Sequence, residues 1–295
     1  MPRALLICPF GILPPVHGGA QRALNLSLAY EDYFHDFLVM APINAEMAQD
    51  RAISQPWSWL PIPPSNLFVR KFVQPILHFL GLRFTKVNSR IALHLILYAR
   101  KYDVLILETL STIELALIYR LFNPRGCVIF DALNDETVLS EKRLDDGLIT
   151  MEEHQKVIFL ESNLHLYAHV VLTCSEKDKV QLVRRNVINE SYFWVIPNGA
   201  HPVIGLDVPR QISEQVNCKP RLLFVGDCRT QPNREAVNYL LDEVLPGLDI
   251  PVELDIVGRW NEGEMPEMAN EAVHFHGFVE DLGASYAKAD LVFVS

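Results

Sequence analysis

Two adjacent glycines near the N-terminus stand where a chain could approach a phosphate or a sugar. Gly18 and Gly19 follow the apolar run 4–8 and directly precede a helical pattern that starts at Ala20. Glycines permit close backbone approach, and the free amides at the start of a helix suit an anion or a sugar hydroxyl. The alternative is a helix start that only needs a flexible entry. A dinucleotide fingerprint is excluded, because no GxGxxG is present.

Two carboxylates occupy comparable positions further along the chain. Glu108 follows the apolar run 104–107, and Asp131 ends the run 127–131. Carboxylates at the ends of parallel strands are candidate acid or base groups, because ligands bind beyond those ends. A solvent-facing acid or a helix cap explains the same pattern equally well.

The C-terminal part repeats this arrangement with glycine and arginine. Gly226 ends the run 221–226, and Arg229 and Asn233 come shortly after it. The planar guanidinium of Arg229 suits phosphate oxygens, although a solvated loop arginine would look the same. Two later strands end in the same way, at Gly258-Arg259 and at Gly277-Phe278-Val279.

No metal site is expected. Glu161, His165 and His169 share one face of a helical pattern, a spacing that could present metal ligands, but no further carboxylate completes a site and HExxH is absent. We therefore interpret these histidines as partly buried structural residues. Five scattered cysteines without a CxxC pair argue against a disulfide framework and a zinc site.

Short apolar runs alternate with helical periodicity, which is typical of a doubly wound α/β fold. The expected strands are 4–8, 37–41, 104–107, 127–131, 170–173, 192–196, 221–226, 252–258, 273–276 and 291–294. The expected helices are 20–33, 88–100, 111–122, 150–169, 176–185, 234–244 and 280–288. We predict one domain over 1–202, a linker over 203–219 and a second, incomplete domain over 220–295.

Charge is distributed unevenly along the chain. The formal net charge of −10 argues against general nucleic-acid binding, yet residues 51–102 hold eight Lys and Arg residues and no Asp or Glu. This segment also contains aromatic residues, so we expect it to face an anionic membrane or a lipid-linked ligand; a solvated face is the alternative. The sequence holds no signal peptide and no apolar run long enough to span a membrane, which predicts a cytoplasmic, peripherally bound protein.

The order of these motifs resembles the group-one family of nucleotide-sugar-dependent glycosyltransferases, which have the GT-B architecture. The resemblance covers nearly the whole chain. It rests on 14–22, on Glu161 and His169, on 196–200, on 224–237, on 256–259 and on 275–282, which reads FHGFVEDL.

The resemblance implies two Rossmann-like domains and retaining transfer of a sugar from a nucleotide-diphosphate donor to a glycan or lipid-linked acceptor, without a cofactor. It places the donor phosphate and base near Gly18, Gly19, Gly226, Arg229, Asn233, Arg259, Phe278 and Val279. We predict acceptor contacts from His17, Asn134 and Asp135. From their places at strand ends we predict catalysis by Glu108 and Asp131, although some family members have a histidine near these positions that this chain lacks. The alternatives are a nucleotide-sugar epimerase of the same fold and a non-catalytic protein that binds a glycan or a partner. In the family, a Gly-rich loop and an acidic helix follow the strand 291–294, so we expect a donor site that is incomplete within these residues.

Overall fold

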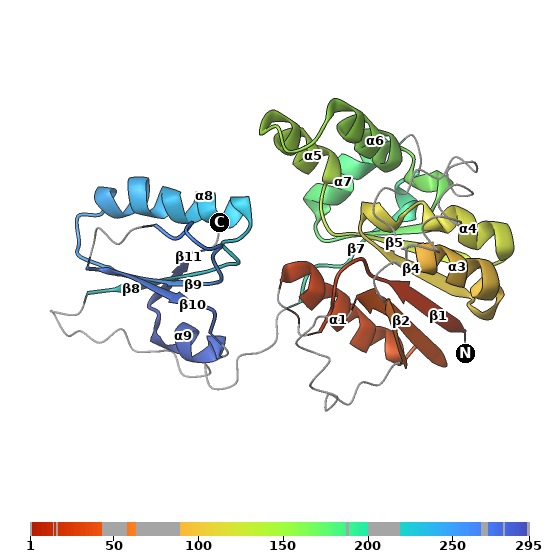
Figure 1. Ribbon diagram of the computed structural model, residues 1–295, viewed down its shortest axis with the longest axis horizontal. Coiled ribbons are helices and arrows are strands. Elements are labelled where there is room, and N and C mark those ends of the chain that lie inside the picture. Colours follow the sequence, from red (N-terminus) through yellow and green to blue (C-terminus); the bar gives the residue numbers. More distant parts are fainter. Residues whose placement is uncertain are drawn as a thin grey trace. The chain divides into compact units, whose positions relative to one another are not determined.

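The computed structural model divides the chain into two units, Met1–Gly199 and Ala200–Ser295 (Figure 1). It describes residues 2–13, 15, 17–42, 58–62, 89–186, 189–199, 219–266, 271–279 and 281–293. The predicted linker over 203–219 lies outside the described residues except for its last position. Each unit is an α/β fold with a parallel sheet, which confirms the predicted fold class.

The first unit is built on a seven-stranded parallel sheet in the order β3-β2-β1-β4-β5-β6-β7. The chain reverses its direction of growth between β1 and β4, and ligands of such sheets bind beyond the carboxyl ends of the strands at this switch point. The strands are β1 (Arg3–Ile7), β2 (Asp36–Pro42), β3 (Ser58–Ile62), β4 (Val104–Glu108), β5 (Cys127–Ala132), β6 (Val170–Thr173) and β7 (Phe193–Val195).

Both faces of this sheet are covered, which explains why its strands are apolar without alternation. In β1, Leu5 and Ile7 belong to one buried cluster, whereas Ala4 and Leu6 belong to another on the opposite face. All four side chains are completely buried.

Helices separate into two layers around the sheet (Figure 1). The helix α1 (Gly18–Glu31) contributes Ala23 to the second cluster, whereas Ile91, Leu115 and Leu182 from other helices belong to the first. The remaining helices are α3 (Ser89–Tyr98), α4 (Leu115–Phe122), α5 (Glu136–Asp145), α6 (Met151–Ser162) and α7 (Glu176–Arg185), with short 3-10 turns at η2 (Ala99–Lys101), η3 (Leu110–Thr112), η4 (Leu164–Leu166) and η5 (Glu190–Tyr192).

The second unit has a four-stranded parallel sheet in the order β10-β9-β8-β11. One face packs against α8 around Phe224, Val237 and Ile256. On β8 and β9, Arg221 pairs with Glu253 at 2.7 Å, and Asp255 accepts a hydrogen bond from His276 of β10 at 2.6 Å. The elements are β8 (Arg221–Val225), α8 (Gln231–Tyr239), continued by η6 (Leu240–Val244) and η7 (Leu245–Gly247), then β9 (Glu253–Val257), β10 (Val273–Gly277), α9 (Leu282–Lys288) and β11 (Leu291–Phe293).

Three elements differ from the sequence-based expectation. The loop expected after Asp131 contains the helix α5, whose residues are largely polar and show little amphipathic pattern. The strand β3 was not among the expected strands; it contains Pro61, which is tolerated because β3 lies at the edge of the sheet. The predicted helix 150–169 ends as α6 at Ser162 and continues only as a 3-10 turn.

The proposed membrane-facing segment falls largely outside the described residues. Only 58–62 and 89–101 of it are described, where Arg100 donates to the carbonyl of Phe122 and Lys101 lies 4.6 Å from the ring centroid of Tyr98. Among the described helices, none is long and apolar enough to cross a bilayer.

Candidate functional site

The helix α1 begins with the two glycines, Gly18 and Gly19, after the connection from β1 at the switch point of the first sheet. His17 caps the helix, since its Nδ1 accepts a hydrogen bond from the amide of Ala20 at 3.1 Å. Its ring stands edge-on to Phe10, with centroids 4.8 Å apart. The predicted acceptor-side residue His17 is therefore part of the helix start itself.

The two glycines have different surroundings. A Cβ atom on Gly18 would have no described heavy atom within 4 Å, whereas one on Gly19 would lie 3.0 Å from Leu133 and 3.2 Å from Phe10. Leu133 lies in the connection after β5, so Gly19 sets how closely α1 approaches that connection.

We expect Gly19→Val to lower the free energy of unfolding by about 2 kcal/mol, because the added methyl groups overpack the contact with Leu133. Gly18→Val is the matched control and should cost no more than about 1 kcal/mol, the helix-propensity scale for an open position. Urea titration followed by circular dichroism measures both values. Equal losses in the two variants would contradict the packing described here.

A buried ion pair lies directly behind this loop. Arg22 is 4% exposed, and its Nε and Nη2 donate to the two carboxylate oxygens of Asp131 at 2.8 and 2.7 Å. Its Nη1 donates to the carbonyl of Ile196 at 2.6 Å and to the side chain of Asn198 at 3.1 Å. The guanidinium therefore connects α1, the end of β5 and the turn after β7.

Glu108 is the neighbour of Asp131 across the sheet, because the register of β4 and β5 pairs the two residues. Its side chain is completely buried, and neither carboxylate oxygen accepts a hydrogen bond from a described donor. Burial raises the pKa of Glu108 well above its ordinary value, and the charge of Asp131 raises it further. A protonated Glu108 can donate its O–H to Asp131, which then carries the one negative charge that balances Arg22.

The two residues predicted as catalytic are thus neighbours, and both are inaccessible to solvent. Burial also raises the pKa of Asp131, which the bidentate contact with Arg22 opposes. Carboxylates in this state can position the strand ends and the loop around them through Arg22. Their predicted catalytic role stays a prediction.

A second ion cluster fixes the start of α5, where two acceptor-side residues were predicted. Asn134 is exposed, whereas Asp135 caps α5 and forms a bidentate pair with Arg185 at 2.6 and 2.7 Å. Glu161 accepts hydrogen bonds from the amides of Glu136 and Thr137 at 2.8 and 3.0 Å. Glu161 therefore stabilises the N-terminus of α5, and the nearby His169 accepts from the amide of Val128 at 2.9 Å as a structural residue.

The second unit presents glycine at the carboxyl ends of three adjacent strands. Gly226 follows β8, Gly258 follows β9, and Gly277 ends β10. The amide of Gly226 donates to Val257 at 3.0 Å, and that of Gly258 donates to Gly277 at 2.8 Å. A Cβ on Gly258 would lie 1.7 Å from the carbonyl oxygen of Gly226. Gly226 and Gly258 therefore allow close packing of the strand ends, whereas no described atom lies within 4 Å of a Cβ on Gly277, so a ligand can approach the backbone there.

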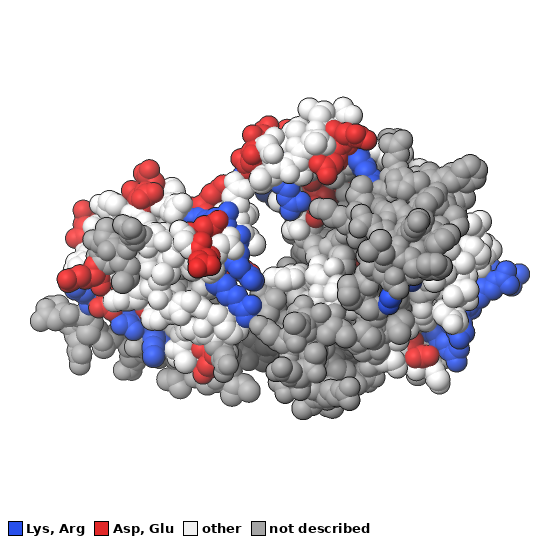
Figure 2. All heavy atoms as spheres, in the orientation of Figure 1, with Lys and Arg blue, Asp and Glu red and all other residues white. Residues whose placement is uncertain are grey.

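Cationic and aromatic side chains border the glycine edge. The guanidinium of Arg259 lies 4.3 Å from the ring centroid of Phe278, which is 57% exposed, and Val279 beside it is half-buried. Arg229 forms a bidentate pair with Asp227 and holds the pKa of that carboxyl below its ordinary value, an effect to which Arg259 adds. Basic side chains gather on one flank of the second unit in Figure 2.

The loop that carries Arg229 is supported from within. Asn233 donates to the carbonyl of Asp227 at 3.0 Å, and Arg234 donates to the carbonyls of Cys228 and Arg229 at 3.2 and 2.7 Å. The predicted donor residue Asn233 therefore holds the loop, whereas Arg229 and Arg259 can meet a diphosphate. The structure brings all predicted donor residues of this unit to one sheet edge.

Sequence reasoning missed Arg22 and Arg185 as the residues that organise the first unit. A signal for Arg22 was present, because it lies between Ala20 and Ala23 on the side of α1 that faces the core, where an arginine needs a buried acid. No local signal marks Arg185, whose partners come from two other elements.

Comparison with known proteins agrees with this geometry. Residues 219–295 match the family described as "Glycosyl transferases group 1". No curated protein is similar enough in sequence to match the chain.

Several solved structures share the fold over nearly the whole chain. A glycosyltransferase from Rickettsia africae ESF-5 is 11% identical with a TM-score of 0.56, over 98% of this chain and 72% of that chain. TarM is 9% identical with a TM-score of 0.61, over 99% and 80%. Arabidopsis thaliana UGT89C1 complexed with UDP is 13% identical with a TM-score of 0.55, over 98% and 74%. The fold is the GT-B architecture, as predicted, and together with the family match it supports a glycosyltransferase.

Proposed function

We propose that the protein transfers a sugar, with retention of configuration, from a nucleotide-diphosphate donor to a glycan or lipid-linked acceptor. The observation that carries the proposal is the glycine edge of the second unit, which lies inside the region similar to group 1 glycosyl transferases. The UDP bound by UGT89C1, whose fold is similar, supports a nucleotide donor.

The chemistry of this edge suits a diphosphate. The open backbone at Gly277 admits a phosphate closely, and Arg259, which stacks on Phe278, supplies a positive charge. Electrostatic stabilisation of the departing diphosphate, together with positioning, would then lower the barrier to transfer. In this proposal Glu108 and Asp131 act through Arg22 as positioning residues.

The proposed location of the protein is the cytoplasmic membrane face, where lipid-linked acceptors occur.

Because the donor site is expected to be incomplete within these residues, transfer is tested with the chain joined to the Gly-rich loop and acidic helix that follow the strand 291–294 in the family. This protein is incubated with UDP-, GDP- and ADP-sugars and with a membrane lipid extract as acceptor. The expected result is release of nucleoside diphosphate together with an acceptor mass increased by one sugar. Conversion of the nucleotide sugar without any acceptor would indicate the epimerase. Nucleotide binding without either reaction would indicate a binding protein, and both results contradict the proposal.

A matched pair of variants locates the donor. Because the donor site is expected to be incomplete within these residues, UDP should bind with a Kd no tighter than about 1 mM, about −4 kcal/mol. We expect Arg259→Ala to weaken this binding about tenfold, equivalent to about 1.4 kcal/mol, because a charge-assisted contact with phosphate is lost. Lys219→Ala removes an exposed cation before the amino end of β8 and should leave the affinity unchanged. Calorimetric titration with UDP measures both, and equal affinities would move the donor away from this edge.

A further inference from the structure

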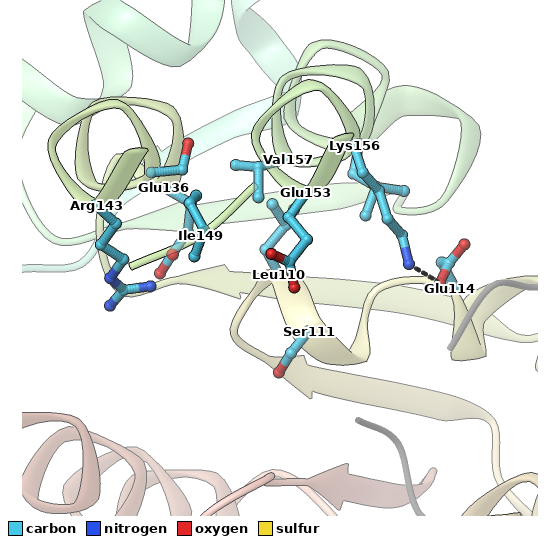
Figure 3. A pocket seen from close by; sticks show the side chains of 11 residues that line it. Leu110, Ser111, Glu114, Glu136, Arg143, Ile149, Glu153, Lys156 and Val157 are labelled. Atoms are coloured by element: carbon cyan, nitrogen blue, oxygen red, sulfur yellow. Dashed lines mark ion pairs between the residues drawn. The ribbon is translucent and has the colours of Figure 1, made fainter. Parts of the chain in front are cut away.

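The first unit contains a pocket of about 200 Å³ beside the carboxyl end of β4. It lies between the turn η3 and the helices α5 and α6 (Figure 3). Four apolar side chains form part of its lining: Leu110, Ile149, Val157 and Leu160. Pockets for drug-sized ligands measure about 300 to 1,000 Å³, so this one suits a group of about one ring.

The rim of this pocket is polar and carries both signs of charge. Lys156 of α6 lies 3.5 Å from Glu114, and Glu153 is held at the start of α6 by the capping box with Thr150. Arg143 and the half-buried Glu136 face the pocket from α5 (Figure 3). Acidic and basic side chains are also interspersed over α5 and α6 in Figure 2. The rim holds three carboxylates and two cations, a formal net charge of −1, and because both signs are present a charged ligand of either sign would meet a like charge.

The turn at the edge of the pocket has an unusual backbone. Thr109 has φ 67° and ψ 153°, a region that is costly for a residue with a side chain. Its hydroxyl is within 2.8 Å of the hydroxyl of Ser111, and the hydroxyl of Thr112 donates to the carbonyl of Glu108 at 2.8 Å. These contacts hold Ser111 at the pocket, and strained residues of this kind cluster at ligand sites.

We propose that this pocket binds one neutral sugar ring of the acceptor. Carboxylates and the exposed Ser111 hydroxyl can exchange hydrogen bonds with sugar hydroxyls, while the apolar lining packs against the C–H face of the ring. A nucleotide would meet three carboxylates, and an acyl chain would have to pass five charged side chains. The inference rests on the proposed sugar transfer, because it assigns that ring to the acceptor.

Saturation-transfer NMR on the full chain tests the pocket. The probes are methyl glucopyranoside and N-acetylglucosamine as neutral rings, with glucuronate and glucosamine as charged ones. We expect the neutral probes to bind with a Kd of about 1 to 10 mM, because a single sugar ring offers few contacts. The charged probes should bind at least fivefold more weakly.

Variants connect the signal to this site. Ile149→Trp fills the pocket and should remove the signal of the neutral probes, whereas Leu148→Trp, at an exposed neighbour, should preserve it. Ser111→Trp, on the exposed turn, also closes the pocket. It replaces Ile149→Trp in the test if that variant melts at a lower temperature than the unmodified protein. No signal from neutral probes, or a signal in both pocket variants equal to that of the unmodified protein, would overturn the proposal.

UDP added to the same samples separates this inference from the proposed function. UDP binding with no sugar signal would reject the pocket and leave the donor site standing. A sugar signal that the pocket variants abolish, without UDP binding, would support the ring site and reject nucleotide-dependent transfer.

Discussion

Gly258→Ala is expected to unfold the second unit under conditions in which Gly263→Ala leaves it folded. The Cβ that this substitution adds would overlap the carbonyl oxygen of Gly226, at 1.7 Å, and the backbone at this position has φ 155°. Neither strand can move aside, because Gly226 and Gly258 are both held in the ladder of hydrogen bonds between strand ends. We expect a loss of more than about 3 kcal/mol, a large part of the stability of a small domain.

Gly263 is the matched control because it also has a positive φ, 77°, but no described atom lies within 4 Å of its Cβ position. Gly263→Ala should therefore lower the free energy of unfolding by about 1 to 2 kcal/mol, which is the cost of holding alanine at a positive φ. Hydrogen exchange followed by mass spectrometry reports the second unit separately, through peptides of β8, β9 and β10. Equal protection of these peptides in the two variants would show that the glycine edge is not closely packed. UDP binding should be lost together with protection.

The second large effect is expected at the buried ion pair of the first unit. Asp131→Ala leaves the guanidinium of Arg22 buried without a counterion, which should lower the free energy of unfolding by about 3 to 5 kcal/mol. Asp36→Ala is the control, since Asp36 lies 4.0 Å from Arg3 with both side chains about half exposed. That exposed pair should contribute no more than about 1 kcal/mol. Chemical denaturation of both variants measures the contrast, and similar losses would contradict the burial of Arg22.

Glu108→Gln should have the opposite effect on stability. Below the ordinary pKa of 4.5 the carboxyl is protonated in both the folded and the unfolded chain, so it contributes no pH dependence. Above pH 4.5 the unfolded chain ionises while the buried Glu108 keeps its proton, and stability falls by about 1.4 kcal/mol per pH unit until the raised pKa is reached.

The glutamine variant carries no proton to lose and so escapes this penalty. We expect its advantage over the unmodified protein to be smallest at about pH 4 and to grow towards neutral pH. A difference in unfolding free energy that does not change with pH would show that Glu108 is ionised in the folded state. Loss of transfer in a stabilised Glu108→Gln variant would support the catalytic role predicted from sequence.

The sequence by itself determined the elements whose signal is local. Continuous apolar runs such as 4–8 identified strands buried on both faces, because only a parallel sheet covered by helices requires such runs. Glycine and charged residues after these runs located both sheet edges, since all strands of a parallel sheet end at one side. The polar helix α5 was missed because its start is held by Glu161, 25 residues away in the sequence.

Only the tertiary structure decided which of these residues contact one another. Arg22 and Asp131 are 109 residues apart, and their pairing depends on the order of β1, β4 and β5 in the sheet. The same order removes Glu108 from water, so that an acid expected at a reactive edge is enclosed and its pKa is raised by burial. Gly226 and Gly258 likewise become contact partners only when β8 and β9 pair in register. Periodicity and spacing describe a chain locally, whereas burial and pairing arise from the packing of distant segments.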